Sequence, residues 1–290
     1  MPASLRPTSA DSVSPAPASP APASPAPSSP RFGPPVRPIP AQAAGQPDVA
    51  RAAALLADPS RARILKALSD GRALTGAVLA SEAGIGAPTA SAHLTRLLDA
   101  GLVTVRSSGR NRFYRLSGPE VGHALEALAL IAPPLPITSL RESRTTSALR
   151  RSRTCYDHLA GRLGVALMGT LLDRGLLTGH DGTHRPATAV RDRSSGYGHD
   201  HHYRLTPSGR TALHQLGIDL DALPPRRPLV RYCVDWSEQQ HHLAGAAGAA
   251  LTARLLTLRW LRHGTSPRVV HLTASGATGL ADWIGLHPPD

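Results

Sequence analysis

The chain has 290 residues, enough for one large or two modest globular domains, and its 32 Lys and Arg residues against 20 Asp and Glu residues give a net charge of +12. Nearly all of the basic residues are arginine, whose rigid fork of donors suits phosphate and guanine, so the charge balance favours an anionic partner. No apolar run reaches the roughly 18 residues of a membrane span, the N-terminus lacks the pattern of a signal peptide, and two cysteines form no disulfide framework. We therefore expect a cytoplasmic protein without membrane contact.

Residues 1–47 form a predicted disordered tail, because Pro, Ala and Ser dominate their composition. Such a segment cannot bury enough apolar surface to offset the entropy lost on ordering. We expect a solvated leader, and a Pro-x-x-Pro ligand is the alternative interpretation of the same residues.

A domain with helical periodicity is predicted over residues 48–132. Apolar residues recur on one face directly after Asp48, which predicts a first helix. Asp58, followed by proline, suits the N-cap of a second helix. Thr75 suits the N-cap of a third helix that runs to Ala83.

The second part of this domain alternates helix and hairpin. After a glycine-containing turn, a fourth helix is predicted over residues 87–100. Two short β-branched and aromatic segments, residues 102–106 and 112–116, predict a β-hairpin, and a fifth helix follows over residues 119–131. This order is that of a winged helix-turn-helix, a mainly α fold with short β-hairpins.

Four motifs support that fold by resemblance. Residues 57–65, A-D-P-S-R-A-R-I-L, resemble the opening motif of ArsR-type regulators, and residues 90–97, A-S-A-H-L-T-R-L, resemble their recognition helix. Residues 99–103 and 109–116 resemble the strand and the wing that follow. The resemblance implies a homodimer that binds double-stranded DNA at two half-sites, with the first and last helices of the domain forming the interface. It also implies a repressor.

Side chains of the fourth helix that lie off its core face are small, polar or basic, as expected for a helix that enters the major groove. Thr89, Ser91 and Ala92 are candidates for base contact, and Arg96 suits a phosphate. His93 either lies near DNA or packs inside the domain. The wing adds basic side chains and no acid, although a merely solvated loop is the alternative. The full predicted DNA-binding set is Thr89, Ser91, Ala92, His93, Thr95, Arg96, Arg110 and Arg112.

The rest of the chain divides into a basic linker, residues 133–152, and a C-terminal domain, residues 153–290, for sensing or dimerisation. The linker either touches the DNA backbone or is a solvated helix. In the C-terminal domain Arg-x-Cys-x-Asp occurs at residues 153–157 and 231–235, and His-Leu-Ala-Gly follows each copy. This repetition predicts two degenerate helix–hairpin–helix repeats, with the order of elements found in a winged helix.

The two cysteines occupy equivalent positions in that repetition, next to candidate oxygen and nitrogen ligands. A site for zinc, cadmium or a similar ion would draw on Cys155, Asp157, His158, Cys233, His241 and His242. The alternative is that the cysteines are buried, inert packing residues at matching positions.

These patterns predict a sequence-specific transcriptional regulator that requires no cofactor and responds to a divalent metal ion or to thiol state, and the resemblance implies that it is a dimeric repressor. The alternative is a metal- or ligand-binding protein with secondary DNA binding. We expect no enzyme, because the sequence has no glycine-rich phosphate loop, nucleophile elbow or His-Glu-x-x-His metal helix.

Overall fold

The computed structural model describes residues 46–185, 187–188 and 201–287. The description below concerns these residues, which belong to one compact unit of the chain. The predicted tail, residues 1–47, lies outside the described residues apart from its last two positions. None of the helices in the described ranges is both long and apolar enough to cross a membrane.

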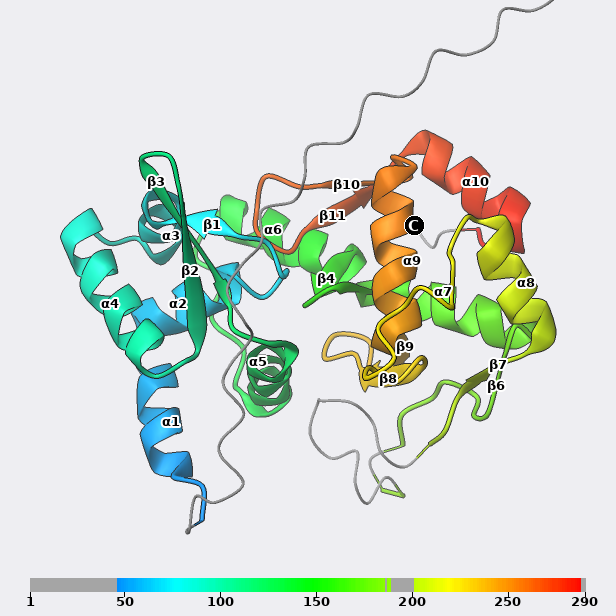
Figure 1. Ribbon diagram of the computed structural model, residues 1–290, viewed down its shortest axis with the longest axis horizontal. Coiled ribbons are helices and arrows are strands. Elements are labelled where there is room, and N and C mark those ends of the chain that lie inside the picture. The colour runs from blue at the N-terminus through cyan, green and yellow to red at the C-terminus, as the bar shows by residue number, and fades with distance from the viewer. Residues whose placement is uncertain (1–45, 186, 189–200, 288–290) are drawn as a thin grey trace, which may run out of the picture. The chain divides into compact units, whose positions relative to one another are not determined.

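Five helices of the first half follow the predicted order (Figure 1). They are α1 Val49–Leu56, α2 Pro59–Ala67, α3 Gly76–Ala83, α4 Ala87–Asp99 and α5 Pro119–Ile131. The Asp58 carboxylate accepts a hydrogen bond from the Arg61 amide, and the Thr75 hydroxyl oxygen accepts one from the Val78 amide, so both predicted N-caps are present. Gly84 ends α3 at a φ of 67°, a left-handed conformation that favours glycine.

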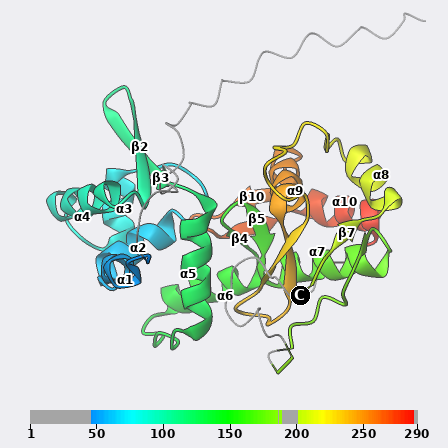
Figure 2. The same ribbon diagram turned by 60° about the horizontal axis from the view of Figure 1, so that its bottom comes forward.

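The wing is a hairpin of β2 Val103–Ser108 and β3 Asn111–Leu116, which stands out from the helices (Figure 2). A third strand, β1 Leu74–Thr75, pairs with β3 and was not expected, because two residues are too few to show a strand period. The core beneath the wing contains Ile64, Leu65, Leu79, Leu94 and Leu97, all at most 2% exposed. The winged helix-turn-helix is thus complete.

The basic linker contains a helix, α6 Leu140–Arg151, with Ser139 as its N-cap. The C-terminal half then shows one order of elements twice: hairpin, helix, hairpin, helix. The first set is β4 Arg153–Cys155, β5 His158–Ala160, α7 Gly161–Asp173, β6 Leu177–Thr178, β7 Arg204–Leu205 and α8 Pro207–Gln215. The second set is β8 Arg231–Val234, β9 His241–Ala244, α9 Gly245–Thr257, β10 Leu261–His263, β11 Val270–Leu272 and α10 Ala274–Ile284.

The structure differs here from the expected helix–hairpin–helix units, since each set begins with an additional hairpin. The strands of these leading hairpins have three or four residues and almost all are buried, so they show no alternation of polar and apolar residues. The turn between β4 and β5 contains no glycine, and Tyr156 itself adopts a φ of 58°. That the two sets are repeats of one unit stays a prediction.

The two sets share one hydrophobic core and interlock, since α7 contacts β9 and α9 contacts β5. Glycines permit this close approach. A Cβ atom at Gly164 would lie 2.6 Å from the Leu159 carbonyl oxygen and 3.7 Å from Cβ of His242. A Cβ atom at Gly248 would lie 2.6 Å from the Leu243 carbonyl oxygen and 3.4 Å from Cβ of His158. Each helix therefore presses against its own hairpin and against a histidine of the other set.

Candidate metal centre and DNA-reading surface

Each leading hairpin presents one thiol and one imidazole as a cross-strand pair. Cys155 lies directly opposite His158 in the β4–β5 hairpin, and Cys233 lies directly opposite His242 in the β8–β9 hairpin. Residues directly opposite in an antiparallel pair project from the same face. The two hairpins thus carry the same two ligand types in the same register.

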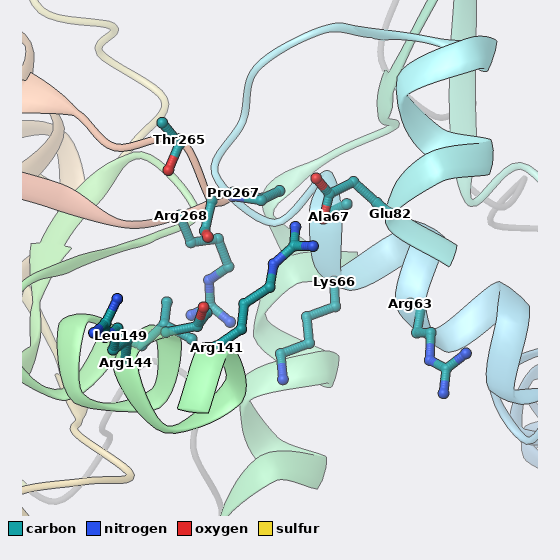
Figure 3. A pocket seen from close by; sticks show the side chains of 12 residues that line it. Arg63, Lys66, Ala67, Glu82, Arg141, Arg144, Leu149, Thr265, Pro267 and Arg268 are labelled. Atoms are coloured by element: carbon teal, nitrogen blue, oxygen red, sulfur yellow. The ribbon is translucent and has the colours of Figure 1, made fainter. Parts of the chain in front are cut away.

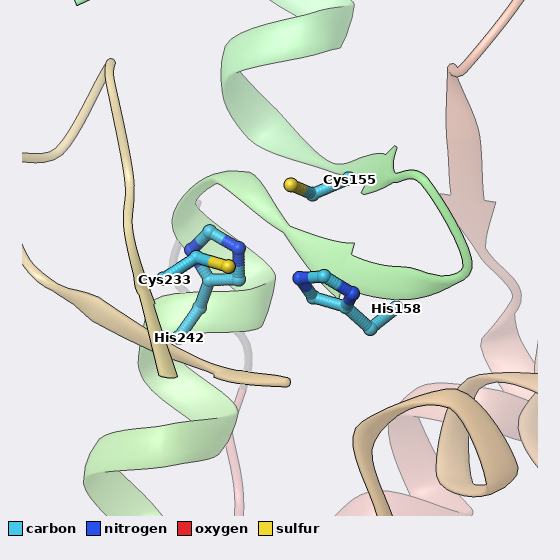
Figure 4. A group of neighbouring side chains, drawn as sticks. All are labelled: Cys155, His158, Cys233 and His242. Carbon is cyan, nitrogen blue, oxygen red and sulfur yellow. The ribbon is translucent and has the colours of Figure 1, made fainter. Parts of the chain in front are cut away.

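The interlocking of the two sets brings these four side chains together (Figure 4). All four are buried, and their candidate ligand atoms lie within 4.8 Å of one another. Tetrahedral zinc with bonds of about 2.3 Å to sulfur and 2.0–2.1 Å to nitrogen places its ligand atoms roughly 3.3–3.8 Å apart. A small contraction of the cluster would therefore suffice for such an ion.

Orphaned nitrogen atoms support the same fit. The Nε2 atoms of His158 and His242 are buried and have no hydrogen-bond partner. Leaving a buried polar atom unsatisfied costs about 1–3 kcal/mol. A cation among the four side chains would satisfy both nitrogens, and two sulfur and two nitrogen donors match the preference of Zn²⁺ and similar ions.

Each histidine also has a carboxylate on the side away from its Nε2 atom. The His158 Nδ1 atom lies 3.3 Å from Asp157 Oδ1, and the His242 Nδ1 atom lies 3.4 Å from Asp235 Oδ2. A carboxylate at the second ring nitrogen orients a metal-bound histidine and raises its basicity. His158 therefore has a carboxylate hydrogen-bonded at its second ring nitrogen, whereas the buried Nδ1 atom of His242 lies near Asp235 without a hydrogen bond.

The two carboxylates are themselves fixed. Asp157 accepts two hydrogen bonds from the Arg227 guanidinium, at 2.6 and 2.9 Å. Asp235 is fully buried and accepts hydrogen bonds from Arg153 at 2.9 Å and from the Gly161 amide at 2.7 Å. Burial alone would raise the pKa of each carboxyl group. Hydrogen bonds with His158 and Arg227 hold the pKa of Asp157 below its usual range, and the charges of Arg153 and His242 do the same for Asp235.

Without a cation, the four side chains perturb one another. A hydrogen bond with Cys233, together with burial, raises the pKa of the Cys155 thiol. Burial opposes the imidazolium of His158, but Cys155 and Asp157 outweigh it and raise the His158 pKa to about 9. Burial lowers the pKa of His242. A divalent ion would instead favour thiolate and neutral imidazole, so metal binding there would release protons.

Four of the six predicted metal ligands therefore meet in one cluster, and two do not. Asp157 accepts a hydrogen bond from Arg227 and lies next to the Nδ1 atom of His158, outside the cluster. His241 points elsewhere, because neighbouring residues of a strand face opposite sides, and its Nδ1 atom lies 2.7 Å from the Tyr203 hydroxyl oxygen. The repeated Arg-x-Cys-x-Asp motif also marks Asp235 as a potential ligand, and its carboxylate lies beside His242 instead of in the cluster.

The predicted DNA-reading residues lie mostly on an open surface. On α4 the side chains of Thr89, Ser91, Ala92 and Arg96 are exposed, opposite the buried Ala90, Leu94 and Leu97. The exposed Arg110 and Arg112 at the wing line a hollow of about 340 Å³ together with Ser91 of α4 and the start of α3. The wing and the recognition helix therefore share one concave, basic face.

Two members of the predicted set have competing partners. The His93 side chain is only 13% exposed, and its Nδ1 atom lies 3.9 Å from the Asp58 carboxylate at the start of α2. This position favours the packing interpretation of His93. The Thr95 hydroxyl is exposed and donates a hydrogen bond to the Ser91 carbonyl oxygen at 3.1 Å.

The tip of the β4–β5 hairpin contacts the winged helix-turn-helix. The Tyr156 amide donates a hydrogen bond of 2.9 Å to the Ser69 carbonyl oxygen, just after α2. The Tyr156 ring packs against α5 at Gly122, where a Cβ atom would lie 3.2 Å from the ring. Tyr156 thus connects Cys155, its neighbour in sequence, to two helices of the winged domain.

A second connection passes through Arg268, in the segment between β10 and β11. The Thr154 amide donates to the Arg268 carbonyl oxygen at 2.8 Å, and the Arg268 Nε atom donates to the Thr154 carbonyl oxygen at 3.1 Å. The Arg268 guanidinium forms an ion pair with Glu126 of α5, and its amide lies 3.4 Å from the Asp70 carboxylate. Both neighbours of Cys155 are therefore linked to the winged domain.

Comparison with known proteins identifies relatives over most of the chain. A helix-turn-helix domain family matches residues 56–106. The HTH-type transcriptional regulator YdfF of Bacillus subtilis is 38% identical over 231 residues, which is 79% of this chain and 94% of YdfF. The winged domain, residues 48–132, is much shorter than this alignment, so the similarity extends into the C-terminal half.

Two further matches concern the winged domain. The HTH-type transcriptional regulator CmtR of Mycobacterium tuberculosis is 39% identical over 83 residues, 29% of this chain and 70% of CmtR. The homodimeric winged helix-turn-helix domain Mb0332 of Mycobacterium bovis, described as a possible ArsR-family regulator, is 31% identical over 30% of this chain and 88% of that chain, with a TM-score of 0.27.

Proposed function

The chain belongs to the ArsR-type winged helix-turn-helix transcriptional regulators, and from that premise we propose that it is a homodimeric repressor whose DNA binding responds to a metal ion in the C-terminal half. Its partner is double-stranded DNA. The observation that carries the metal proposal is the convergence of Cys155, His158, Cys233 and His242, with the two histidine Nε2 atoms buried and unsatisfied.

We assign DNA reading to the concave face shared by α4 and the wing. Thr89, Ser91 and Ala92 contact base edges, and Arg96, Arg110 and Arg112 contact phosphates. Exposure of these side chains on one face supports the assignment.

The dimer interface is assigned to α1 and α5. Among the side chains that the structure describes on these helices, three large apolar ones are exposed within one chain: Val49 at 71%, Leu128 at 42% and Ile131 at 72%. Isolated apolar residues on a surface are common, but a set of them on two helices of one domain suits a partner surface. Substitution of Ile131 by Asp would give a monomer in analytical ultracentrifugation at concentrations where the unmodified protein is a dimer, and a monomeric unmodified protein would refute the assignment.

The metal centre is suited to zinc, cadmium or a similar thiophilic ion, held by two thiolates and two neutral imidazoles. It would be closed, with four protein ligands and no open coordination position, so its role would be structural or sensory and not catalytic. Each hairpin supplies half of the ligands, so the ion would fasten the two sets of elements to each other.

Regulation is proposed to pass through the residues on either side of Cys155. Tyr156 contacts Ser69 and Gly122, and Thr154 contacts Arg268, which pairs with Glu126 on α5. Metal binding that tightens the β4–β5 hairpin would therefore act on the end of α2 and on α5, the helix assigned to the dimer interface. An effector acts only as far as its affinity differs between two states, so metal affinity must differ between the DNA-bound and free protein.

Two measurements test the proposal separately. Fluorescence anisotropy with duplex from the protein's own upstream region, against scrambled duplex at two salt concentrations, tests sequence-specific binding. Selective binding with a steep salt dependence supports the regulator, while equal weak binding to both duplexes would leave a merely basic surface.

Native mass spectrometry with added Zn²⁺ or Cd²⁺ tests the centre. We expect one ion per chain, loss of the ion in the variants C155S and C233S, and retention of the ion in H214A, which removes an exposed histidine of α8. A protein that takes up no ion but forms a Cys155–Cys233 disulfide on oxidation would instead support a response to thiol state.

A further inference from the structure

A second candidate ligand site lies away from the metal centre, in a cavity of about 500 Å³ (Figure 3). Its walls come from three parts of the chain: α2 with the end of α3, the linker helix α6, and the segment between β10 and β11. The volume is within the range of about 300–1,000 Å³ that small-molecule sites occupy. Neither the DNA-reading surface nor the metal centre shares any of its lining residues.

The lining is strongly cationic. It contains five basic side chains, Arg63, Lys66, Arg141, Arg144 and Arg268, and one acidic side chain, Glu82. Hydroxyl groups of Thr145, Thr265 and Ser266 add hydrogen-bond donors, and Ala67, Leu149 and Pro267 add a small apolar surface. A lining of this kind suits a compact organic anion and excludes an apolar ligand.

The protein itself uses only some of these charges. Arg268 is paired with Glu126, and the Arg63 guanidinium donates to the Ala83 carbonyl oxygen at 3.1 Å. In Figure 3, Arg63 and Arg144 extend to opposite sides, with Lys66 and Arg141 between them. Within the described ranges, no carboxylate forms an ion pair with Lys66 or Arg144. Burial raises the pKa of the Glu82 carboxyl group, and the charge of the nearby Arg141, which forms no ion pair with Glu82, opposes part of that rise.

We propose that this cavity binds a small organic phosphate, held by Lys66, Arg141 and Arg144. Arginine forks and a lysine ammonium are the groups that proteins use for phosphate oxygens. The ligand would join α2 of the winged domain to the linker helix and to the segment that carries Arg268. It would therefore act on the same domain as the metal ion, but through its own site.

The electrostatic setting of Lys66 agrees with this assignment. Burial lowers the pKa of the Lys66 ammonium, and repulsion from Arg268 lowers it further. An anion in the cavity would relieve that repulsion. Lys66 is also the only lysine in the sequence, so an amine-reactive reagent would modify this side chain and, apart from it, only the α-amino group of the chain.

That property gives a direct test on the full-length protein. Acetylation of Lys66 by an N-hydroxysuccinimide ester would be followed by mass spectrometry, with the α-amino group as internal reference. The probes are fructose 1,6-bisphosphate, fructose 6-phosphate and fructose, which share one scaffold and differ in charge, with sodium chloride at equal ionic strength as a control for screening. We expect the bisphosphate to slow acetylation at least about fivefold, the monophosphate to act less, and fructose and sodium chloride to have no effect.

Matched variants locate the site. R144A should raise the bisphosphate concentration needed for protection about tenfold, which corresponds to about 1.4 kcal/mol. R150A removes an exposed arginine from the same helix that does not line the cavity, and it should leave protection within about twofold of the unmodified protein, as expected for charges screened by solvent.

Three results would overturn the proposal. The first is no protection of Lys66 by the bisphosphate at tens of millimolar. The second is equal weakening by R144A and R150A, which would indicate diffuse charge. The third is lack of protection together with a lower DNA affinity and a shallower salt dependence in R144A, which would assign these cations to the phosphates of duplex DNA.

Discussion

The substitution C233S should remove most of the stabilisation that zinc gives to the protein. Cys233 lies directly opposite His242 and is buried with the other three ligand side chains. Zinc at about 1,000 times its dissociation constant would stabilise the folded protein by about 4.1 kcal/mol, because the four-ligand site exists only in the folded chain. At about 2–4 °C per kcal/mol for a protein of this size, Tm would rise by roughly 10 °C.

Loss of one thiolate that weakens zinc binding about a hundredfold would leave about 1.4 kcal/mol of that stabilisation at the same zinc concentration. The assay is differential scanning fluorimetry with zinc or with a chelator. In the chelator, C233S should unfold close to the unmodified protein, because serine nearly preserves the volume of the thiol.

H241A provides the matched control. His241 is buried next to His242 in sequence, but it contacts Tyr203 and lies outside the four-residue cluster. H241A should therefore lower Tm under both conditions and keep the zinc-dependent shift. An unmodified protein with the same Tm in zinc and in chelator would refute the metal centre, and so would a full zinc shift in C233S.

Three further predictions concern other parts of the molecule. Burial lowers the pKa of His123 to about 4, below its ordinary value near 6.5, so protonation opposes folding: its contribution to stability is present above pH 6.5 and is lost as the pH falls toward 4. In urea titrations, the free energy of unfolding should fall by about 1–3 kcal/mol less in H123Q than in the unmodified protein between pH 6.5 and pH 4. The same fall in both proteins would contradict this account of His123. R268M, which leaves Glu126 buried without its cation, should cost about 3–5 kcal/mol in the same titration, and addition of E126Q should recover part of the loss. R110A and R112A should each weaken binding to specific and scrambled duplex alike and reduce the salt slope by about one, whereas a loss confined to specific duplex would indicate base reading by the wing.

The winged domain could be predicted in detail because its signals are local. Asp58 and Thr75 cap helices within three residues of themselves, and the core of α4 follows a helical period that the sequence displays directly. The strand β1 was missed because its only pattern is a pairing with β3, forty residues further along the chain.

The metal cluster was only partly predictable for the opposite reason. The sequence shows two equivalent cysteines and nearby histidines, but 78 residues separate Cys155 from Cys233. Whether His242 or His241 joins the cluster depends on which face of β9 packs against α7, and that packing depends on the small size of Gly164. The role of Tyr156 as a link to the winged domain likewise arises from tertiary packing, since no local pattern predicts an aromatic residue at positive φ in a hairpin turn.

DNA affinity measured with the metal site filled and stripped tests the central claim most directly. Anisotropy titrations with the upstream duplex would be carried out in zinc and in chelator, for the unmodified protein and for C155S. Coupling of about 1–3 kcal/mol between the sites predicts that metal lowers the DNA affinity of the unmodified protein between about fivefold and 150-fold, while C155S shows no change. Equal affinities for the filled and stripped protein, or the same metal response in C155S, would contradict regulation through this centre.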